Sequence, residues 1–177
     1  MAIGFLIAGL ACAWACTWEI SLGPGDGVRS FKFETDIPNP ALKKDGDIVM
    51  TRDFLLMDEM RSRRYLDTFG PDKIGALRRV TLTVVDVRIV GVDLATTGPP
   101  NLVIAGHSLS GKPGASVELD DDQVDWLRSR LLDAEPVVTT LTVDLRAPLA
   151  ALDARVPSLH ITVEIQPTLV IDGTRTF

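Results

Sequence analysis

One serine in this chain has the neighbours that a nucleophile needs. Ser108 lies in the segment 106–111, GHSLSG, directly after a short apolar run. Asp153 and His160 follow it along the chain, in the order acid then base. A serine hydroxyl becomes a nucleophile when a histidine accepts its proton and an acid orients that histidine. Ser108, His160 and Asp153 are therefore the candidate catalytic residues.

The segment 106–111 resembles the nucleophile elbow of the α/β-hydrolases, where a glycine stands on either side of the serine at a strand-to-helix turn. The resemblance implies a hydrolase that uses Ser108. Here Ser110 replaces the second glycine, and a Lys-Pro-Gly stretch breaks the helix that should follow. His160 lies in an alternating pattern typical of a strand. We therefore interpret His107, Ser108 and Ser110 as an exposed turn between two strands and make no catalytic assignment.

Other residues have the types that bind ions but lack the required spacing. The segment 111–114, GKPG, offers backbone amides to an anion without the spacing of a nucleotide-binding loop. Asp45 with Asp47, and the acids at 120–122 with Asp125, lack the ligand series of a calcium loop. The second acidic group also suits a helix start, where negative charge is favourable. The sequence predicts no metal and no cofactor.

The chain is acidic, with 18 Lys and Arg residues against 24 Asp and Glu and a net charge of −6. Because binding to phosphate backbones requires a basic face, nucleic acid is not an expected partner. The densest basic stretch comprises Arg61, Arg63 and Arg64, with Arg78 and Arg79 further on. We interpret it as the solvated carbonyl end of a helix, where cations are favourable, rather than as a site for an anionic ligand.

The first fifteen residues have the composition of an export signal. Residues 1–15 contain no charged side chain, and Glu19 ends the apolar stretch before the roughly 20 residues that a membrane-spanning helix needs. Small residues stand three and one positions before both Cys12 and Cys16, as a signal peptidase requires. The sequence predicts a leader over 1–15 and one globular domain over 16–177. The alternative is a cytosolic domain in which 1–15 belong to the core.

The positions of Cys12 and Cys16, the chain's only 2 cysteines, resemble that of the lipidated cysteine in bacterial lipoproteins. The resemblance implies a lipid anchor at Cys12 or Cys16 and a place in the cell envelope. The sequence departs from the family's pattern in two ways. No branched aliphatic residue stands three positions before either cysteine, and the leader has no Lys or Arg near its start.

Alternating apolar residues predict strands over much of the chain. They are expected at 17–22, 28–34, 79–94, 101–105, 115–119, 137–146 and 158–171. A change of phase near Val84 predicts a β-bulge there. Helices are expected at 53–66, ended by Gly70-Pro71, and at 120–133, with a loop at 36–47. Asp120 and Gln123 have the spacing of a capping box, and Trp126 is expected in the core.

Because strands outnumber helices and do not alternate regularly with them, the sequence predicts a mainly β fold, an antiparallel β-sandwich with one or two short helical insertions. From about residue 77 onward the layout is similar to that of small, functionally uncharacterised bacterial envelope lipoproteins with a β-sandwich domain, which implies no activity. We expect an exported binding or structural module, lipid-anchored, periplasmic or secreted, with a protein or glycan partner. The alternatives are a serine hydrolase using Ser108 and a cytosolic β-rich domain.

Overall fold

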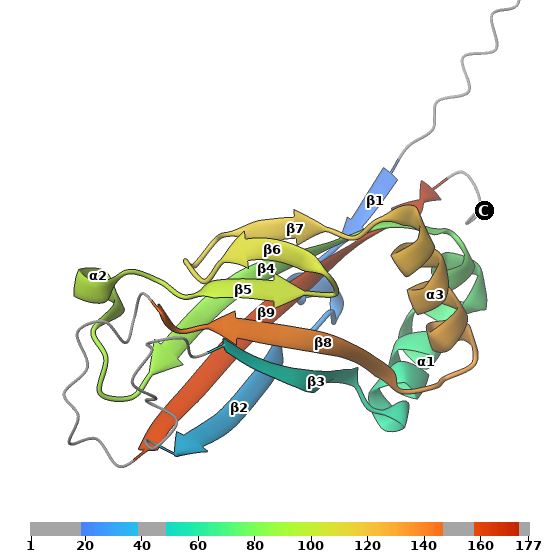
Figure 1. Ribbon diagram of the computed structural model, residues 1–177. Coiled ribbons are helices and arrows are strands. Elements are labelled where there is room, and N and C mark those ends of the chain that lie inside the picture. Colours follow the sequence, from blue (N-terminus) through green and yellow to red (C-terminus); the bar gives the residue numbers. More distant parts are fainter. Residues whose placement is uncertain (1–18, 39–48, 147–157, 174–177) are drawn as a thin grey trace, which may run out of the picture.

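The structure is a computed structural model that describes residues 19–38, 49–146 and 158–173. Two antiparallel sheets pack against each other (Figure 1). The predicted fold, a mainly β antiparallel sandwich with helical insertions, is confirmed. The leader 1–15, both cysteines and Asp153 lie outside the described residues.

The first sheet is organised around its longest strand, which pairs along both edges. Its strands are β1 (Glu19–Leu22), β2 (Phe31–Pro38), β4 (Leu77–Ile89), β7 (Ser116–Glu118) and β9 (Ser158–Asp172). β1 and β2 pair with successive parts of one edge of β9, β4 pairs with the other edge, and β7 follows β4. The predicted bulge is confirmed, because the register between β4 and β9 shifts between Val84 and Asp86.

The second sheet has the strand order β3-β8-β5-β6. Its strands are β3 (Val49–Met57), β5 (Asn101–Ile104), β6 (His107–Ser110) and β8 (Val137–Asp144). The core lies between the two sheets, where alternate side chains of β5, β8 and β9 are fully buried. These include Leu102, Ile104, Leu141, Val143, Ile161, Val163 and Ile165. Burial of such apolar surface is the main favourable term in folding.

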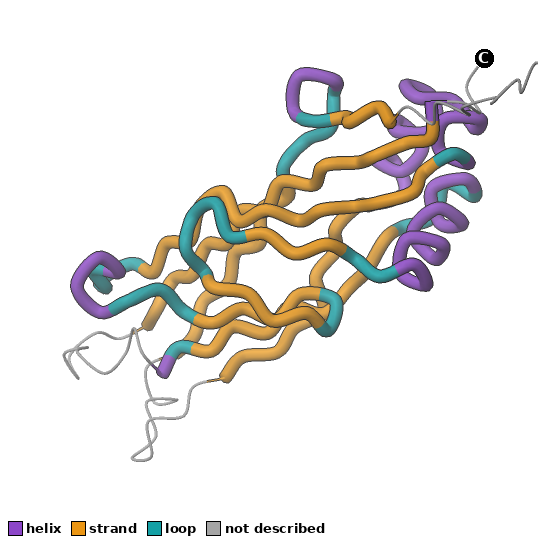
Figure 2. The backbone as a smooth tube through the Cα atoms, turned by 90° about the horizontal axis from the view of Figure 1, so that it is seen from above, coloured by secondary structure: helices purple, strands orange, loops and turns teal. Residues whose placement is uncertain are grey.

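Two helices pack against each other at one end of the sandwich (Figures 1 and 2). They are α1 (Glu59–Gly75) and α3 (Asp121–Leu132), while the short α2 (Leu94–Thr97) lies at the opposite end and a 3-10 turn, η1 (Pro24–Asp26), follows β1. The capping box of α3 is confirmed, since the Asp120 carboxylate accepts from the Gln123 amide at 2.9 Å. In α1, Gly70 (φ 79°, ψ 159°) interrupts the helix before Pro71, where the sequence predicts a stop.

The predicted helix at 53–66 is wrong in its first part. Residues 53–57 belong to β3, and α1 begins only at Glu59, after the N-cap Asp58. Phe54 pairs with Thr139 of β8 and its ring meets that of Phe33 edge-on, with centroids 5.7 Å apart. Pairing with a strand that lies far along the chain outweighs the helical spacing of the apolar residues.

Three further expectations need correction. His107, Ser108 and Ser110 belong to strand β6 instead of a turn, because Ala105 (φ 52°) and Gly106 (φ 85°) make the turn before it. Trp126 is 40% exposed, since the buried face of α3 is formed by neighbouring positions. The predicted loop at 36–47 begins later, because β2 continues through Pro38, and the rest of that loop lies outside the described residues.

Candidate functional site

The structure places Ser108 and His160 on different sheets. Ser108 is exposed on β6, opposite Val103 of β5, whereas His160 lies on β9. Nδ1 of His160 is 2.9 Å from Oδ1 of Asp36, its cross-strand neighbour on β2. No hydrogen bond joins Ser108 to His160 in the part of the chain that the structure describes.

His107, from the same motif, has a contact that fixes the β5–β6 turn. Its Nε2 lies 2.8 Å from Oε1 of Gln123, and the side-chain amide of Gln123 donates to the carbonyl of Ala105 at 2.6 Å. These bonds connect the turn to the first residues of α3. The histidine therefore positions secondary structure.

Two acidic residues of the 120–125 group have structural partners. Asp120 caps the helix and Asp125 forms an ion pair with Arg128 at 2.7 Å. Within residues 19–38, 49–146 and 158–173, no group of three or more His, Cys, Asp or Glu side chains is placed to hold a metal ion. Asp45 and Asp47 lie outside that part of the chain.

The basic stretch lies at the opposite end of a helix from the one expected. Arg61, Arg63 and Arg64 stand in the first two turns of α1, which begins at Glu59. The amino end of a helix carries partial positive charge, so cations there are locally unfavourable. The interpretation as a carbonyl end stabilised by cations is therefore wrong.

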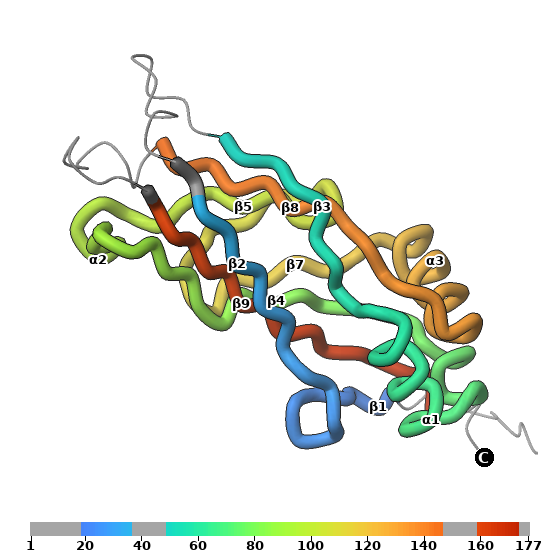
Figure 3. The backbone as a smooth tube through the Cα atoms, turned by 90° about the horizontal axis from the view of Figure 1, so that it is seen from below, coloured from blue at the N-terminus to red at the C-terminus, as the bar shows by residue number. Residues whose placement is uncertain are grey.

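One face of α1 forms the wall of a cleft. Arg61, Arg64, Tyr65, Thr68 and Phe69 recur at the three- and four-residue spacing that places side chains on one side of a helix. The opposite wall comes from the chain between β1 and β2, through Gly27, Arg29 and Phe31. Figure 3 shows this chain turning near α1. The cleft has a volume of about 190 Å³, and we call it the arginine cleft.

The three arginines of the cleft lack partners among the described residues. No hydrogen bond or ion pair there involves the guanidinium group of Arg29, Arg61 or Arg64, and no carboxylate lines the cleft. Six other described arginines form ion pairs with carboxylates, whereas Arg52 and Arg63 form none. The paired ones are Arg78, Arg79, Arg88, Arg128, Arg130 and Arg146. Positive charge is thus concentrated at one place in an acidic chain.

Tyr65 supplies a buried hydroxyl at the edge of this charge. The residue is 6% exposed, and its oxygen accepts a hydrogen bond from the backbone amide of Arg29 at 3.0 Å. Burial raises the pKa of Tyr65, while that hydrogen bond and the charges of Arg61 and Arg29 oppose the rise in pKa. The phenol therefore keeps its proton at neutral pH and can donate it.

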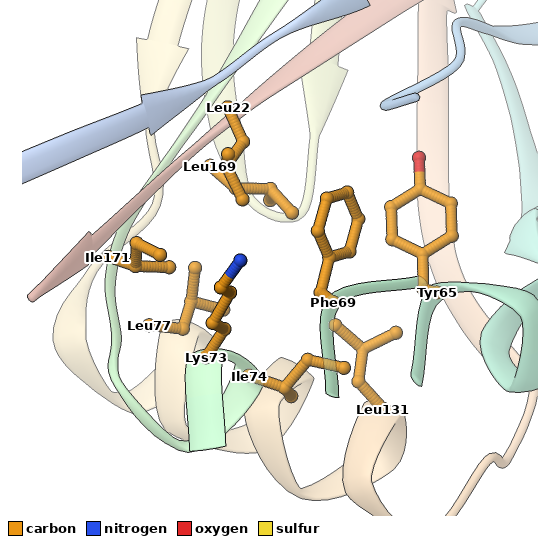
Figure 4. Close-up of a pocket in the computed structure, with 9 residues that line it drawn as sticks. All are labelled: Leu22, Tyr65, Phe69, Lys73, Ile74, Leu77, Leu131, Leu169 and Ile171. Atoms are coloured by element: carbon orange, nitrogen blue, oxygen red, sulfur yellow. The ribbon is translucent and has the colours of Figure 1, made fainter. Parts of the chain in front are cut away.

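Tyr65 and Phe69 also border a second, apolar pocket. Figure 4 shows its lining, with the Tyr65 hydroxyl directed away from Ile74 and Leu131. This pocket has a volume of only about 10 Å³, close to the roughly 10–15 Å³ that one water needs. We therefore interpret it as a packing gap. The arginine cleft, at about 190 Å³, is much larger.

The sequence shows Arg61 and Arg64 as basic residues but does not indicate the other walls of the cleft. In a helix that begins at Glu59, the spacing of Tyr65 and Phe69 relative to the two arginines places all four side chains on one face. This spacing is a sequence signal for the α1 wall of the cleft. No sequence signal joins Arg29 to them, because it lies on a segment after β1.

Within the described segments, no helix combines the length and the apolar character needed to cross a membrane. Comparisons of the chain with protein-family models, with curated proteins and with solved structures give no match, so the cleft is interpreted from its own geometry.

Proposed function

We propose that this protein is an exported binding module, anchored by a lipid at Cys12 or Cys16, that holds its ligand in the arginine cleft. The observation that carries the proposal is the set of three guanidinium groups around one cleft, none paired with a described residue. Holding like charges around one cleft has an electrostatic cost, which solvent partly screens because all three arginines are exposed. A ligand that supplies negative charge removes this cost.

The leader supports the location. Glu19, where β1 begins, follows Cys16 by only three positions, and residues 1–15 are apolar or small. An extended chain spans at most about 3.6 Å per residue, so an anchor at Cys16 would hold β1 within roughly 11 Å of the modified cysteine. β1 and α1 belong to the same region of the molecule (Figure 3).

Membrane fractionation of the native host, followed by intact mass measurement, tests the location. We expect a membrane-bound species that begins at Cys12 or Cys16 and carries added acyl mass. Cys12→Ala and Cys16→Ala, made separately, identify the modified residue, because only one of them should release the protein. A soluble species that still carries residues 1–15 would contradict export.

Labelling with a fluorophosphonate tests the binding role against hydrolysis. We expect no labelling of the native protein, since Ser108 and His160 lie on different sheets without a shared hydrogen bond. Labelling that disappears in Ser108→Ala would establish a reactive serine and replace the binding role with a hydrolase. Ser110→Ala, two residues along the same strand, is the matched control.

A further inference from the structure

The lining of the arginine cleft specifies the chemistry of its ligand. We propose that the cleft binds a small organic phosphate monoester. Its phosphate lies among Arg29, Arg61 and Arg64, and its organic part lies against Tyr65 and Phe69. The inference rests on the binding role proposed above, but it requires neither export nor a lipid anchor.

The charge of the cleft matches a dianion. Arginine stays protonated at all physiological pH values and presents paired N–H groups that fit phosphate oxygens. Three such groups line this cleft, and no acidic residue is among its lining. A phosphate monoester carries between one and a half and two negative charges at neutral pH, more than a carboxylate or a sulfate ester.

The hydrogen-bonding groups of the cleft are mainly donors. A guanidinium group has five N–H donors and no acceptor. The Tyr65 oxygen already accepts from the Arg29 amide, which leaves its proton for a ligand, and Thr68 adds a hydroxyl. A ligand with many acceptors, such as phosphate, satisfies these donors.

The size and the aromatic lining indicate that the phosphate carries an organic group. The volume of about 190 Å³ exceeds by far the roughly 10–15 Å³ that one water needs. Phe31, which is 3% exposed, and Phe69 add aromatic carbon beside Tyr65. The neighbouring apolar pocket, at about 10 Å³, has no room for an acyl chain. The organic part is therefore compact.

Calorimetric titration of the full chain with four probes tests the inference. Phenyl phosphate supplies both parts of the ligand, phenyl sulfate has the same shape with less charge, inorganic phosphate lacks the organic part, and phenol lacks the anion. We expect phenyl phosphate to bind most tightly and phenol not to bind. Added salt should weaken the binding, because the attraction is between charges.

Substitutions on α1 locate the site. We expect Arg61→Gln and Arg64→Gln each to weaken binding of phenyl phosphate about tenfold or more, as expected for loss of a hydrogen bond between charged groups. Arg63→Gln is the matched control. It removes the same charge from the same helix, but Arg63 lines a separate depression with Asp58, Glu59 and Met60, so binding should change less than twofold. Thermal unfolding of each variant shows whether it is folded.

Each contrary result has a distinct meaning. If Arg63→Gln weakens binding as much as Arg61→Gln, the anion is attracted by the general positive charge of α1, and its assignment to the arginine cleft is wrong. If phenyl sulfate or inorganic phosphate binds as tightly as phenyl phosphate, the monoester assignment is wrong. Saturable binding of citrate in place of the phosphates, lost in Arg61→Gln, would overturn the phosphate inference but retain the binding role. No binding of any anion at millimolar concentration would overturn both.

Discussion

The two long helices in the described part of the chain pack against each other, yet they differ in how their charges are balanced. α3 begins with a capping box and two further acids, ends near Arg130, and pairs Asp125 with Arg128. α1 also begins with an aspartate cap, but three arginines follow within two turns, and none of them has an ion pair with a described residue.

Under the proposed function, this difference separates a helix that serves only the fold from one that also lines a binding site. The acids in the first turn of α3 and Arg130 in its last turn agree with the helix dipole, whereas Asp133 at its C-cap does not. In α1, Arg61 and Arg64 place positive charge near the amino end of the helix, where the dipole disfavours it, and both line the arginine cleft. Natural proteins depart from local rules mainly at functional sites, where another gain compensates.

The largest expected effect concerns the structural role of α3. Leu131→Ala should lower the free energy of unfolding by about 2–5 kcal/mol, because Leu131 is 1% exposed and its loss leaves a cavity. Leu132→Ala, the same change at a position that is 37% exposed, should cost less than about 1 kcal/mol. Urea unfolding followed by circular dichroism measures both. Equal losses would show that α3 does not pack in the orientation described.

A second test compares one arginine from each helix. Arg128→Gln should cost about 1.5–3 kcal/mol, because Arg128 donates to the carbonyl of Leu77 as well as pairing with Asp125. Arg64→Gln should change the free energy of unfolding by less than about 0.5 kcal/mol relative to the native protein, since the Arg64 side chain has no hydrogen bond or ion pair with a described residue. Chemical denaturation in ligand-free buffer measures both. A loss for Arg64→Gln as large as that for Arg128→Gln would show that α1 needs this arginine for stability and would weaken the contrast.

The two caps are expected to behave alike. Asp58 accepts from the Arg61 amide at 2.8 Å, and Asp120 accepts from the Gln123 amide at 2.9 Å. Asp58→Ala and Asp120→Ala should therefore each lower the free energy of unfolding by about 1 kcal/mol. Thermal unfolding of the two variants side by side measures the difference. A neutral Asp58→Ala would mean that α1 departs from local rules at its cap as well as in its arginines.

The smallest effect concerns Tyr65, the only tyrosine in the chain, so ultraviolet titration of tyrosinate reports this residue alone. Burial raises the pKa of Tyr65 above the ordinary tyrosine value of 10.0, so the midpoint of the titration should lie above that pH. The pKa of Tyr65 is higher in the folded than in the unfolded protein. Its contribution to folding stability is therefore fully present below about pH 10 and is lost as pH rises through the folded-state pKa. Arg61→Gln should move the midpoint further upward, since the positive charge that it removes stabilises tyrosinate. A midpoint below 10 would show that Tyr65 is not buried.

Local patterns were sufficient for the parts of the fold that depend on neighbouring residues. The bulge near Val84 and the capping box of Asp120 and Gln123 were predicted, because a phase change and a three-residue spacing are visible in the sequence. The turn predicted at His107, Ser108 and Ser110 was wrong, because Ala105 and Gly106 make the turn and residues 107–110 pair with β5 as a strand. Segment 53–57 was assigned to the wrong element, because its apolar spacing fits both periods.

The sequence by itself determined the alternation that makes this a mainly β chain, the capping box of α3 and the presence of basic residues at 61–64. Only the tertiary structure decided that β3 pairs with β8 and that Arg29 meets the same cleft as Arg61 and Arg64. The physical reason is range. Alternation and capping act between residues a few positions apart, whereas the arginine cleft depends on packing between segments that are distant along the chain and close only after folding.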